Sequence, residues 1–505
     1  MMFMKRNNSY RPGMRFALIA IFSLSLIAIL YTFSTGISGN DFWWHVKVGE
    51  WVVENDRIPT SDIFSWYGVE INAPWVAHEW LSDVIFFFIY DCAGSFGIFL
   101  LSLVSAIAML MLLWKQTERS IQNNVLISGL FFAVFAVSTS VFFYGRPHLF
   151  SFFLLFVELR LLYSFINNPS SKGIYFIPII ALLWSNIHGG SSNLSYLLCI
   201  AFLVVGCLKI SIGCIIPQRL EKKAIIKLSV VIVLSLAAIL LNPVGVKMLL
   251  YPYQNMGDDL MLAVISEWRA PDAKNLGDLI LFYFPVVLML LGFFAEHKRI
   301  KLIDLAIMGV FILLFLRSVR FIMLWYIAAP FCAFQYLPEC KIKPINPKTE
   351  KILIILCVLI LAISVGASAL TVMETIDDDQ LISTVISDDV IKEIEEINPK
   401  RLFNDYNLGE TLIFNDISVF FDARADVYAY ENMLADGVSL MLLEQANEES
   451  NIAYVDVEAL IGKYNFDTIL ILKSRPLYSY LISHPEKYVC TFENPELGLF
   501  EVRGS

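Results

Sequence analysis

Residues 16–35, FALIAIFSLSLIAILYTFST, form an uncharged and mostly apolar run near the start of the chain. A helix needs about 20 apolar residues to cross the hydrocarbon core of a bilayer. The run is too long for the apolar part of a signal peptide, and no convincing small-residue cleavage site accompanies it. The sequence therefore predicts a retained signal anchor, which places the chain in a membrane from its first helix.

Ten further segments resemble this first one. The chain is 57% hydrophobic and 17% charged, whereas soluble domains have roughly 45–50% apolar and about 25% charged residues. The composition therefore predicts a polytopic α-helical membrane protein with about eleven transmembrane helices. The expected spans are 15–35, 95–114, 125–143, 149–167, 174–187, 192–210, 225–242, 278–295, 303–317, 321–337 and 352–372.

Basic residues occupy the N-terminus and every second short loop, at 115–119, 172, 219–223, 298–301 and 341–351. Lys and Arg are retained on the cytoplasmic side of a membrane. The pattern predicts a multi-pass protein of the plasma membrane with a cytoplasmic N-terminus. With an odd number of spans, the C-terminal tail is expected outside the cytoplasm.

The tail differs from the rest of the chain in charge. Residues 372–505 contain 26 acidic and 9 basic residues, against 21 and 28 in the remainder. We expect a transmembrane domain over 1–372, whose first outer loop is 36–94, and a soluble acidic α/β domain over 373–505. Strands are expected at 411–415, 419–424, 468–473 and 498–503, and helices at 387–398 and 457–465. Scattered basic residues and the lack of a nucleotide-binding fingerprint argue against nucleic-acid or nucleotide binding.

The first outer loop is predicted to contain two interfacial helices. FWWHVKVGEWVV (42–53) has the pattern of an amphipathic helix, with its indoles at the depth of the lipid headgroups. WVAHEWLSDVIFFFIY (75–90) is expected to form the second helix, opened by His78 and Glu79. On the first helix, Asp41 and His45 are four residues apart and should share a face.

Polar residues gather in the segments that the topology places at the outer face. They are His45, His78, Arg146, His148, Asn186, His188, Glu267, Arg269, Arg317 and Arg320. Polar groups at membrane depth are costly and tend to line a cavity. We therefore expect a polar site that opens to the outside.

Several stretches resemble the GT-C superfamily of membrane glycosyltransferases, which includes protein O-mannosyltransferases and the aminoarabinose transferase of lipid A. They are DFWWHVKVGEWVVENDRIPTSDIFSW (41–66), HEWLSD (78–83), GRPHLFSF (145–152), WSNIHGG (184–190), NPVGVKMLLYP (242–252), SEWRAPD (266–272), RSVRF (317–321), RLFNDYNLGETLIF (401–414) and FFDARADVY (420–428). The nearer resemblance is to bacterial multispan GT-C-like proteins of the cell envelope. These stretches span nearly the whole chain.

The resemblance implies a sugar donor linked to polyprenyl phosphate and an acceptor outside the cytoplasm. It also implies that the acid just after the first span, Asp41, is the general base, with inversion by single displacement. Many members have a second acid, and Glu79 is the best candidate because residue 42 is Phe. The alternative for Asp41 is a purely structural helix cap, which contributes about 1 kcal/mol.

Three interpretations of His45 stay open: it orients Asp41, binds a metal or rests at the headgroups. His45, His78 and Glu79 have the ligand chemistry for a divalent cation, but their spacing fits no compact zinc pattern. The prediction is therefore no firm cofactor and no metal site, with divalent-cation dependence left open.

The donor phosphate is expected to bind Arg317 and Arg320. Three residues apart on one helix, they would share a face, and guanidinium groups bind phosphate through paired hydrogen bonds. Arg146 is a weaker candidate because Pro147 indicates an ordinary turn. Alternatively, each of these three arginines binds no ligand and only extends its guanidinium to the charged surface of the lipid bilayer.

The remaining predicted substrate-binding residues are His78, His148, Asn186, His188, Glu267 and Arg269. Two glycines after His188 would allow close approach of a ligand, or simply form a turn. Glu267 and Arg269 either cover the site or form an exposed ion pair of little energetic weight. The DARAD sequence (422–426) either meets the acceptor or solvates a turn.

The sequence thus predicts a glycosyltransferase whose partners are a polyprenyl-phosphate sugar, an acceptor and membrane lipids. Two alternatives remain. One is a non-catalytic membrane scaffold in the assembly of envelope polymers. The other is a polysaccharide polymerase or ligase that uses lipid diphosphate donors.

Overall fold

A computed structural model describes residues 13–34, 41–255, 266–295, 299–340, 344–377, 386–445 and 453–503. The chain divides into two compact units. The first, the helical unit, comprises residues 1–38, 93–252 and 265–381, and the second, the tail unit, comprises residues 39–92, 253–264 and 382–505.

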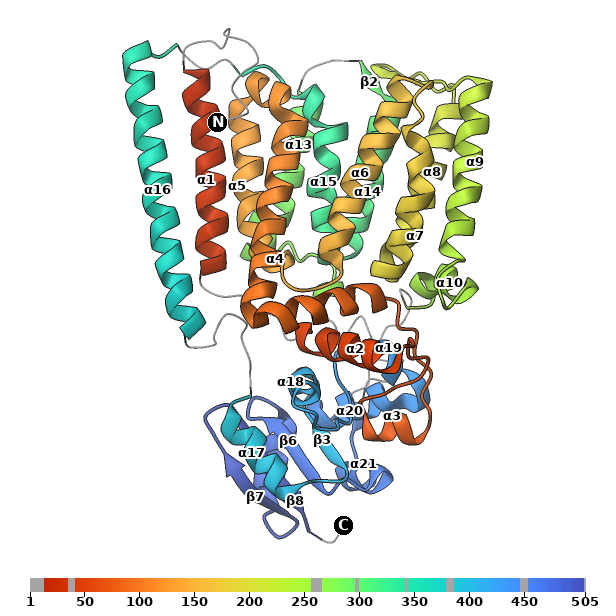
Figure 1. The fold of residues 1–505 in the computed structure, drawn as a ribbon, viewed down its shortest axis with the longest axis vertical. Coiled ribbons are helices and arrows are strands. Elements are labelled where there is room, and N and C mark those ends of the chain that lie inside the picture. The colour runs from red at the N-terminus through yellow and green to blue at the C-terminus, as the bar shows by residue number, and fades with distance from the viewer. Residues whose placement is uncertain are drawn as a thin grey trace. The chain divides into compact units, whose positions relative to one another are not determined.

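The helical unit is a bundle whose long helices lie side by side (Figure 1). The long kinked helix α4 (Trp80–Asn123) begins in the tail unit and continues here beyond Gly94, whose φ of 56° only glycine adopts readily. The other helices are α1 (Met14–Ser34), α5 (Val125–Phe142), α6 (His148–Asn167), α7 (Ile177–Ile187), α8 (Gly189–Cys207), α9 (Lys222–Ile239), α10 (Val246–Asn255), α12 (Leu276–Asp278), α13 (Phe284–Phe294), α14 (Leu302–Arg317), α15 (Ile322–Cys332) and α16 (Pro347–Asp377). Short helical turns are η2 (Gly173–Phe176), η3 (Ser266–Trp268), η4 (Leu279–Tyr283), η5 (Val319–Phe321) and η6 (Phe334–Tyr336), and strands β1 (Ile215–Ile216) and β2 (Ile300–Lys301) pair in parallel.

Each of the eleven predicted spans falls on helix in the described part of the chain. Six helices there are long and apolar enough to cross a membrane: Met14–Ser34, Trp80–Asn123, His148–Asn167, Gly189–Cys207, Leu276–Phe294 and Pro347–Glu374. Three other predicted spans fall on shorter apolar helices, and the remaining two fall on α9 and α14. The chain is therefore a helical multispan membrane protein, with apolar cores built around large buried side chains such as Trp184, Trp325 and Tyr326.

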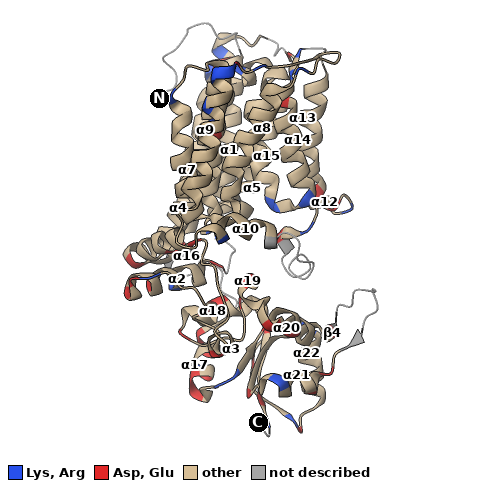
Figure 2. Cartoon of the chain, turned by 90° about the vertical axis from the view of Figure 1, so that its right-hand side faces the viewer, with Lys and Arg blue, Asp and Glu red and all other residues tan. Residues whose placement is uncertain are grey.

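Basic side chains are unevenly distributed over the helical unit. Figure 2 shows Lys and Arg gathered at the end where α1 begins, with a second, smaller group beside α12. The first group agrees with the alternation of basic loops along the sequence. The basic residues at 5–11, 298, 341 and 343 lie outside the described residues.

The tail unit combines the first loop with the C-terminal region. The loop supplies α2 (Phe42–Asn55), α3 (Trp66–Glu70) and the start of α4. The C-terminal region supplies α17 (Asp388–Ile397), β3 (Leu402–Asn404), η7 (Tyr406–Leu408), α18 (Gly409–Phe414), α19 (Ala425–Tyr428), η8 (Tyr430–Asn432), α20 (Met433–Leu442), β4 (Glu444–Gln445), β5 (Ala453–Tyr454), α21 (Val457–Tyr464), β6 (Thr468–Leu472), α22 (Pro476–Ser483), β7 (Tyr488–Glu493) and β8 (Leu497–Val502).

A mixed four-stranded sheet in the order β3-β6-β8-β7 forms the centre of the C-terminal region. β3 runs parallel to β6, whereas β8 is antiparallel to both β6 and β7. Consecutive residues of β6 and β8 are buried, with Ile469, Leu470, Leu499 and Phe500 all at most 1% exposed, so both faces of these two strands are covered. A small hairpin of β4 and β5 is separate from this sheet.

The predicted elements of the tail are confirmed in part. Helices α17 and α21 and strands β6 and β8 lie where the sequence predicts them. The strand expected at 411–415 is wrong, because Gly409–Phe414 is helix α18, and no strand forms at 419–424. A short continuous apolar run fits a buried helix as well as a strand, so periodicity could not separate the two.

The first loop belongs structurally with the tail. The sequence-based boundaries place 36–94 in the transmembrane domain, whereas residues 39–92 cluster with 382–505 in the structure. The indole Nε1 of Trp66 donates to the carbonyl oxygen of Leu402 at 3.0 Å, and Ser65 forms a bridge with Val419. Trp43 and Trp44 are only 6% and 7% exposed. These two indoles are core residues of the tail unit, which corrects their predicted role as lipid anchors.

Candidate functional site

Helices α2 and α4 cross so closely that Gly49 has no room for a side chain. A Cβ atom on Gly49 would lie 2.1 Å from the carbonyl oxygen of Asp83 and 2.7 Å from Cβ of Phe87. One turn before Gly49, Nδ1 of His45 lies 2.6 Å from Oδ1 of the same Asp83. The start of α2 is therefore held against α4 by close backbone packing and by a buried hydrogen bond.

Replacement of Gly49 with Ala is expected to destabilise the tail unit. In a helix, alanine is more favourable than glycine by about 1 kcal/mol. The clash of the new Cβ with the backbone of α4 destabilises the folded state by about 1–3 kcal/mol or more, which outweighs that gain. The matched control is Gly462→Ala on α21, where a Cβ would meet nothing within 4 Å. Thermal unfolding should show a loss for the first variant and no loss for the second. Equal stability of the two variants would contradict the close packing.

Asp41 occupies the cap position of α2. Its backbone is helical, with φ of −54° and ψ of −27°, and its side chain makes no capping hydrogen bond. A cap residue normally has extended backbone and accepts a hydrogen bond from the first turn. The side chain of Asp41 therefore does not make the hydrogen bond that a purely structural cap would make, and its carboxylate is half-buried.

The other predicted catalytic residues lie in the same unit. His45 is 2% exposed, and its ring centroid is 3.7 Å from that of Trp44. Glu79 is 8% exposed, and its Oε2 lies 3.9 Å from Nδ1 of His78. Helix α4 begins at Trp80, so His78 and Glu79 precede the helix that they were expected to open. Within the described ranges, no three His, Cys, Asp or Glu side chains gather into a metal site.

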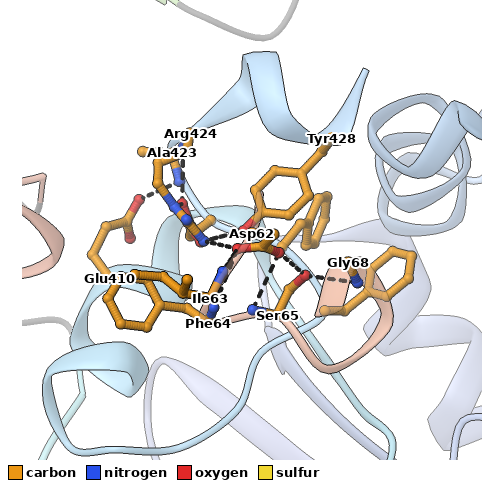
Figure 3. Close-up of polar contacts among 12 residues, drawn as sticks. Asp62, Ile63, Phe64, Ser65, Gly68, Glu410, Ala423, Arg424 and Tyr428 are labelled. Atoms are coloured by element: carbon orange, nitrogen blue, oxygen red, sulfur yellow. Dashed lines mark hydrogen bonds and ion pairs between the residues drawn. The ribbon is translucent and has the colours of Figure 1, made fainter. Parts of the chain in front are cut away.

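A buried ion network joins the first loop to the tail (Figure 3). Arg424 binds Asp422 through Nε at 2.9 Å and Nη2 at 2.6 Å, and its Nη2 lies 3.0 Å from Oδ1 of Asp62. The hydroxyl of Tyr428 donates to Asp422, and the guanidinium lies 4.8 Å from the ring centroid of Trp75. The side chains of Arg424, Asp422 and Asp62 are at most 1% exposed. The expectation that DARAD solvates a turn is therefore wrong for Asp422 and Arg424.

Glu410 on α18 is a buried acid that sequence reasoning missed. Burial raises the pKa of Glu410 well above its usual range, and the charges of Asp41 and Asp422 raise it further. Asp41 and Glu410 are thus electrostatic neighbours although 369 positions separate them. No local pattern in 401–414 marks Glu410, because its partner lies at the other end of the chain.

The helical unit holds a second polar group, centred on Glu267. Nη1 of Arg146 lies 2.8 Å from Oε1 of Glu267, and the hydroxyl of Tyr144 donates to the same oxygen at 2.7 Å. Burial alone would raise the pKa of Glu267, but Arg146, Arg320 and the Tyr144 hydroxyl outweigh it and lower the pKa to about 2. Glu267 is therefore ionised, and it neutralises Arg146.

Arg317 and Arg320 do not share one helix face. Helix α14 ends at Arg317, and Ser318 is extended, with φ of −156° and ψ of 137°, before the short turn η5 begins. Arg317 is exposed, whereas Arg320 is half-buried and acts electrostatically on Glu267 and His148. The shared helix face predicted for the two arginines is therefore wrong. In the described part of the chain, the guanidinium of Arg320 forms no ion pair.

The segment before η5 is fixed by backbone contacts. Oγ of Ser318 donates to the carbonyl oxygen of Glu267 at 2.8 Å, and the amide of Val319 donates to that of Arg269 at 3.0 Å. The side chain of Arg269 is 43% exposed and pairs with Asp278 at 2.5 Å. Arg269 thus pairs with the buried Asp278 of α12, and Glu267 pairs with Arg146, so the exposed ion pair expected between Glu267 and Arg269 does not form.

The remaining predicted ligands are bonded within the bundle. His148 is 8% exposed and its Nε2 bonds to the carbonyl oxygen of Phe142. His188 lies at the break between α7 and α8, where its Nδ1 is 2.6 Å from Oγ of Ser151. Asn186 donates to the carbonyl oxygen of Leu182 at 2.8 Å. The chain breaks at His188 between α7 and α8, and the two glycines after it begin α8.

Comparison with known proteins finds similarity in structure but not in sequence. The sequence matches no protein-family profile and no curated protein. The fold is similar to that of the archaeal oligosaccharyltransferase AglB from Archaeoglobus fulgidus, whose structure was determined with an inhibitory peptide and a dolichol-phosphate. The TM-score is 0.49 at 10% sequence identity, over 90% of this chain and 69% of that chain. A likeness of this size does not assign an activity.

Proposed function

We propose that this chain is a membrane glycosyltransferase of the GT-C type. It moves a sugar from a polyprenyl-phosphate carrier to a hydroxyl acceptor outside the cytoplasm, with its N-terminus inside and its tail outside. The observation that carries the proposal is the position of the Asp41 carboxylate. This carboxylate follows the first span in the sequence and lies half-buried at the start of α2, the helix that packs closely against α4.

Transfer from a lipid phosphosugar needs a group that takes the proton of the acceptor hydroxyl. A carboxylate shielded in part from water is a stronger base than one in bulk solvent. Asp41 acting directly on the acceptor gives a single displacement, so the anomeric configuration inverts. His45 and Asp83 then have a positioning role, because their buried bond fixes the start of the helix that carries Asp41.

The leaving phosphate needs a cation that is not already neutralised. In the helical unit, Arg146 is bound by Glu267, whereas Arg320 forms no ion pair within the described residues. Arg320 is half-buried, where a guanidinium interacts with phosphate more strongly than in water. We therefore assign donor phosphate binding to Arg320 and a supporting role to the Arg146–Glu267 pair.

Mass spectrometry of lipid that co-purifies with the protein tests this assignment. The wild type is expected to retain a polyprenyl phosphate or its glycosylated form. Arg320→Ala should lose most of this lipid, whereas the matched variant Arg317→Ala, at the exposed end of α14, should retain it. A lipid without phosphate, or equal retention by both variants, would contradict the assignment.

The same measurement distinguishes the donor classes. A monophosphate lipid supports the glycosyltransferase proposed here. A retained lipid diphosphate would favour the polymerase or ligase, which uses donors of that kind.

A further inference from the structure

Helix α18 brings an acid from the tail against the first loop. The ring of Phe414 at its end lies 4.5 Å from that of Trp43 on α2. At its start, Gly409 lies so close to the following segment that a Cβ would be 2.5 Å from the carbonyl oxygen of Phe421. The second residue of α18, Glu410, is therefore held in a fixed place inside the tail unit.

Only one oxygen of the Glu410 carboxyl group is hydrogen-bonded. Oε1 accepts from the amide of Ala423 at 2.9 Å, and Figure 3 shows this bond beside the Arg424 network. Oε2 is buried and has no partner among the described residues. The whole residue is 2% exposed. An ionised carboxylate in this position would leave one buried charged oxygen without a donor from the described protein residues, which is costly.

The groups around this carboxyl disfavour a second negative charge. Asp41 precedes α2, Asp422 follows α18, and both act on Glu410 electrostatically. The phenol of Tyr406 on η7 also lies within range and stays neutral, because burial raises its pKa well above the usual value. Arg424 is bound to Asp422 and so balances that acid rather than Glu410.

Two basic groups of α2 have acidic partners other than Glu410. Nζ of Lys47 lies 2.6 Å from Glu50 and 2.7 Å from Asp416, and His45 is bonded to Asp83. Within the described ranges, no cation forms an ion pair with the buried acid of α18. Two acids that repel one another in a low dielectric share one proton rather than ionise together.

We propose that Glu410 holds this proton and thereby keeps Asp41 the charged member of an acid pair. Glu410 is a positioning residue: it does not touch the reacting atoms, but it fixes the protonation state of the base. The claim that Glu410 keeps a catalytic base charged rests on the proposed function. The claim that Glu410 and Asp41 share one proton does not. The raised pKa of Glu410 has the cause and direction that this arrangement requires.

Infrared difference spectroscopy of the full chain in lipid nanodiscs tests the proton directly. A protonated carboxyl group absorbs at a C=O frequency that ionised carboxylates do not show. At neutral pH, the spectrum of the wild type minus that of Glu410→Gln should contain one such band. The amide oxygen of Gln can still accept from Ala423, so this variant is expected to fold.

Two further variants serve as a control and as a test of the effect of the Asp41 charge. The control Glu496→Gln makes the same change at an exposed position of the tail unit and should remove no band. In Asp41→Asn, the neighbouring charge is gone, so the Glu410 band should disappear at a lower pH than in the wild type. Absence of a Glu410-dependent band, or an unchanged titration in Asp41→Asn, would overturn the inference.

The pH dependence of transfer separates this inference from the proposed function. Glu410→Gln should transfer sugar at neutral pH but lack the change in rate that the wild type shows when the pair loses its last proton. If Asp41→Asn stops transfer but leaves the titration of the band unchanged, the shared proton is wrong and the base assignment stands. If the band behaves as expected but Asp41→Asn transfers sugar normally, the proposed function is wrong and the shared proton stands.

Discussion

Asp41→Asn is expected to abolish sugar transfer while the protein still folds and inserts. An amide cannot take a proton from the acceptor, and loss of a general base typically lowers a rate by about 10²–10⁴-fold. The change leaves the shape of the side chain nearly intact. It also removes no capping hydrogen bond, because Asp41 makes none. Transfer of labelled sugar from a polyprenyl-phosphate donor to an extracted acceptor measures the loss.

Asp56→Asn is the matched control for this prediction. Asp56 lies at the other end of α2, is exposed, and has a left-handed φ of 49°, which asparagine tolerates well. Its replacement should leave both transfer and folding unchanged. Full activity of Asp41→Asn would exclude Asp41 as the base and favour the non-catalytic scaffold.

The largest effect on stability is expected at Arg424. Removal of this side chain in Arg424→Ala leaves Asp62 and Asp422 buried without their cation, since both are less than 1% exposed at the side chain. Breaking a buried ion pair from one side costs about 3–5 kcal/mol. The free energy of unfolding of the tail unit, followed by tryptophan fluorescence during denaturation, should fall by that amount.

An exposed ion pair between the same two segments provides the control. Nη2 of Arg401 lies 3.3 Å from Oε2 of Glu70, with 34% and 54% of the side chains exposed. Arg401→Ala should cost about 1 kcal/mol or less, because solvent screens such a pair. If both arginine variants lose equal stability, the buried network does not have the role assigned to it.

The helices of this protein were largely predictable, because each is encoded in a continuous stretch. Long apolar runs mark the spans, and short apolar runs mark β6 and β8. The strand predicted at 411–415 failed because Thr411, Leu412, Ile413 and Phe414 form an unbroken run that suits either element. The break at His188 was visible in the sequence because a polar residue and two glycines interrupt an apolar pattern.

The site was less predictable, because its contacts join distant positions. Asp41 and Glu79 could be found from the first loop alone. Glu410 could not, since nothing near it indicates that Asp41 is its neighbour. The shared face predicted for Arg317 and Arg320 is wrong, because the extended backbone of Ser318 ends the helix that would have aligned them.

The tail unit is assembled from two segments that the ribosome produces at very different times. Asp62 emerges 362 residues before Arg424, and synthesis proceeds at about 5–20 residues per second, so the acid waits for about 20–70 seconds. During that interval the first loop has an uncompensated acid in its future core. A chain that stops before residue 424 never completes this core, because Asp62 then lacks the guanidinium that pairs with it.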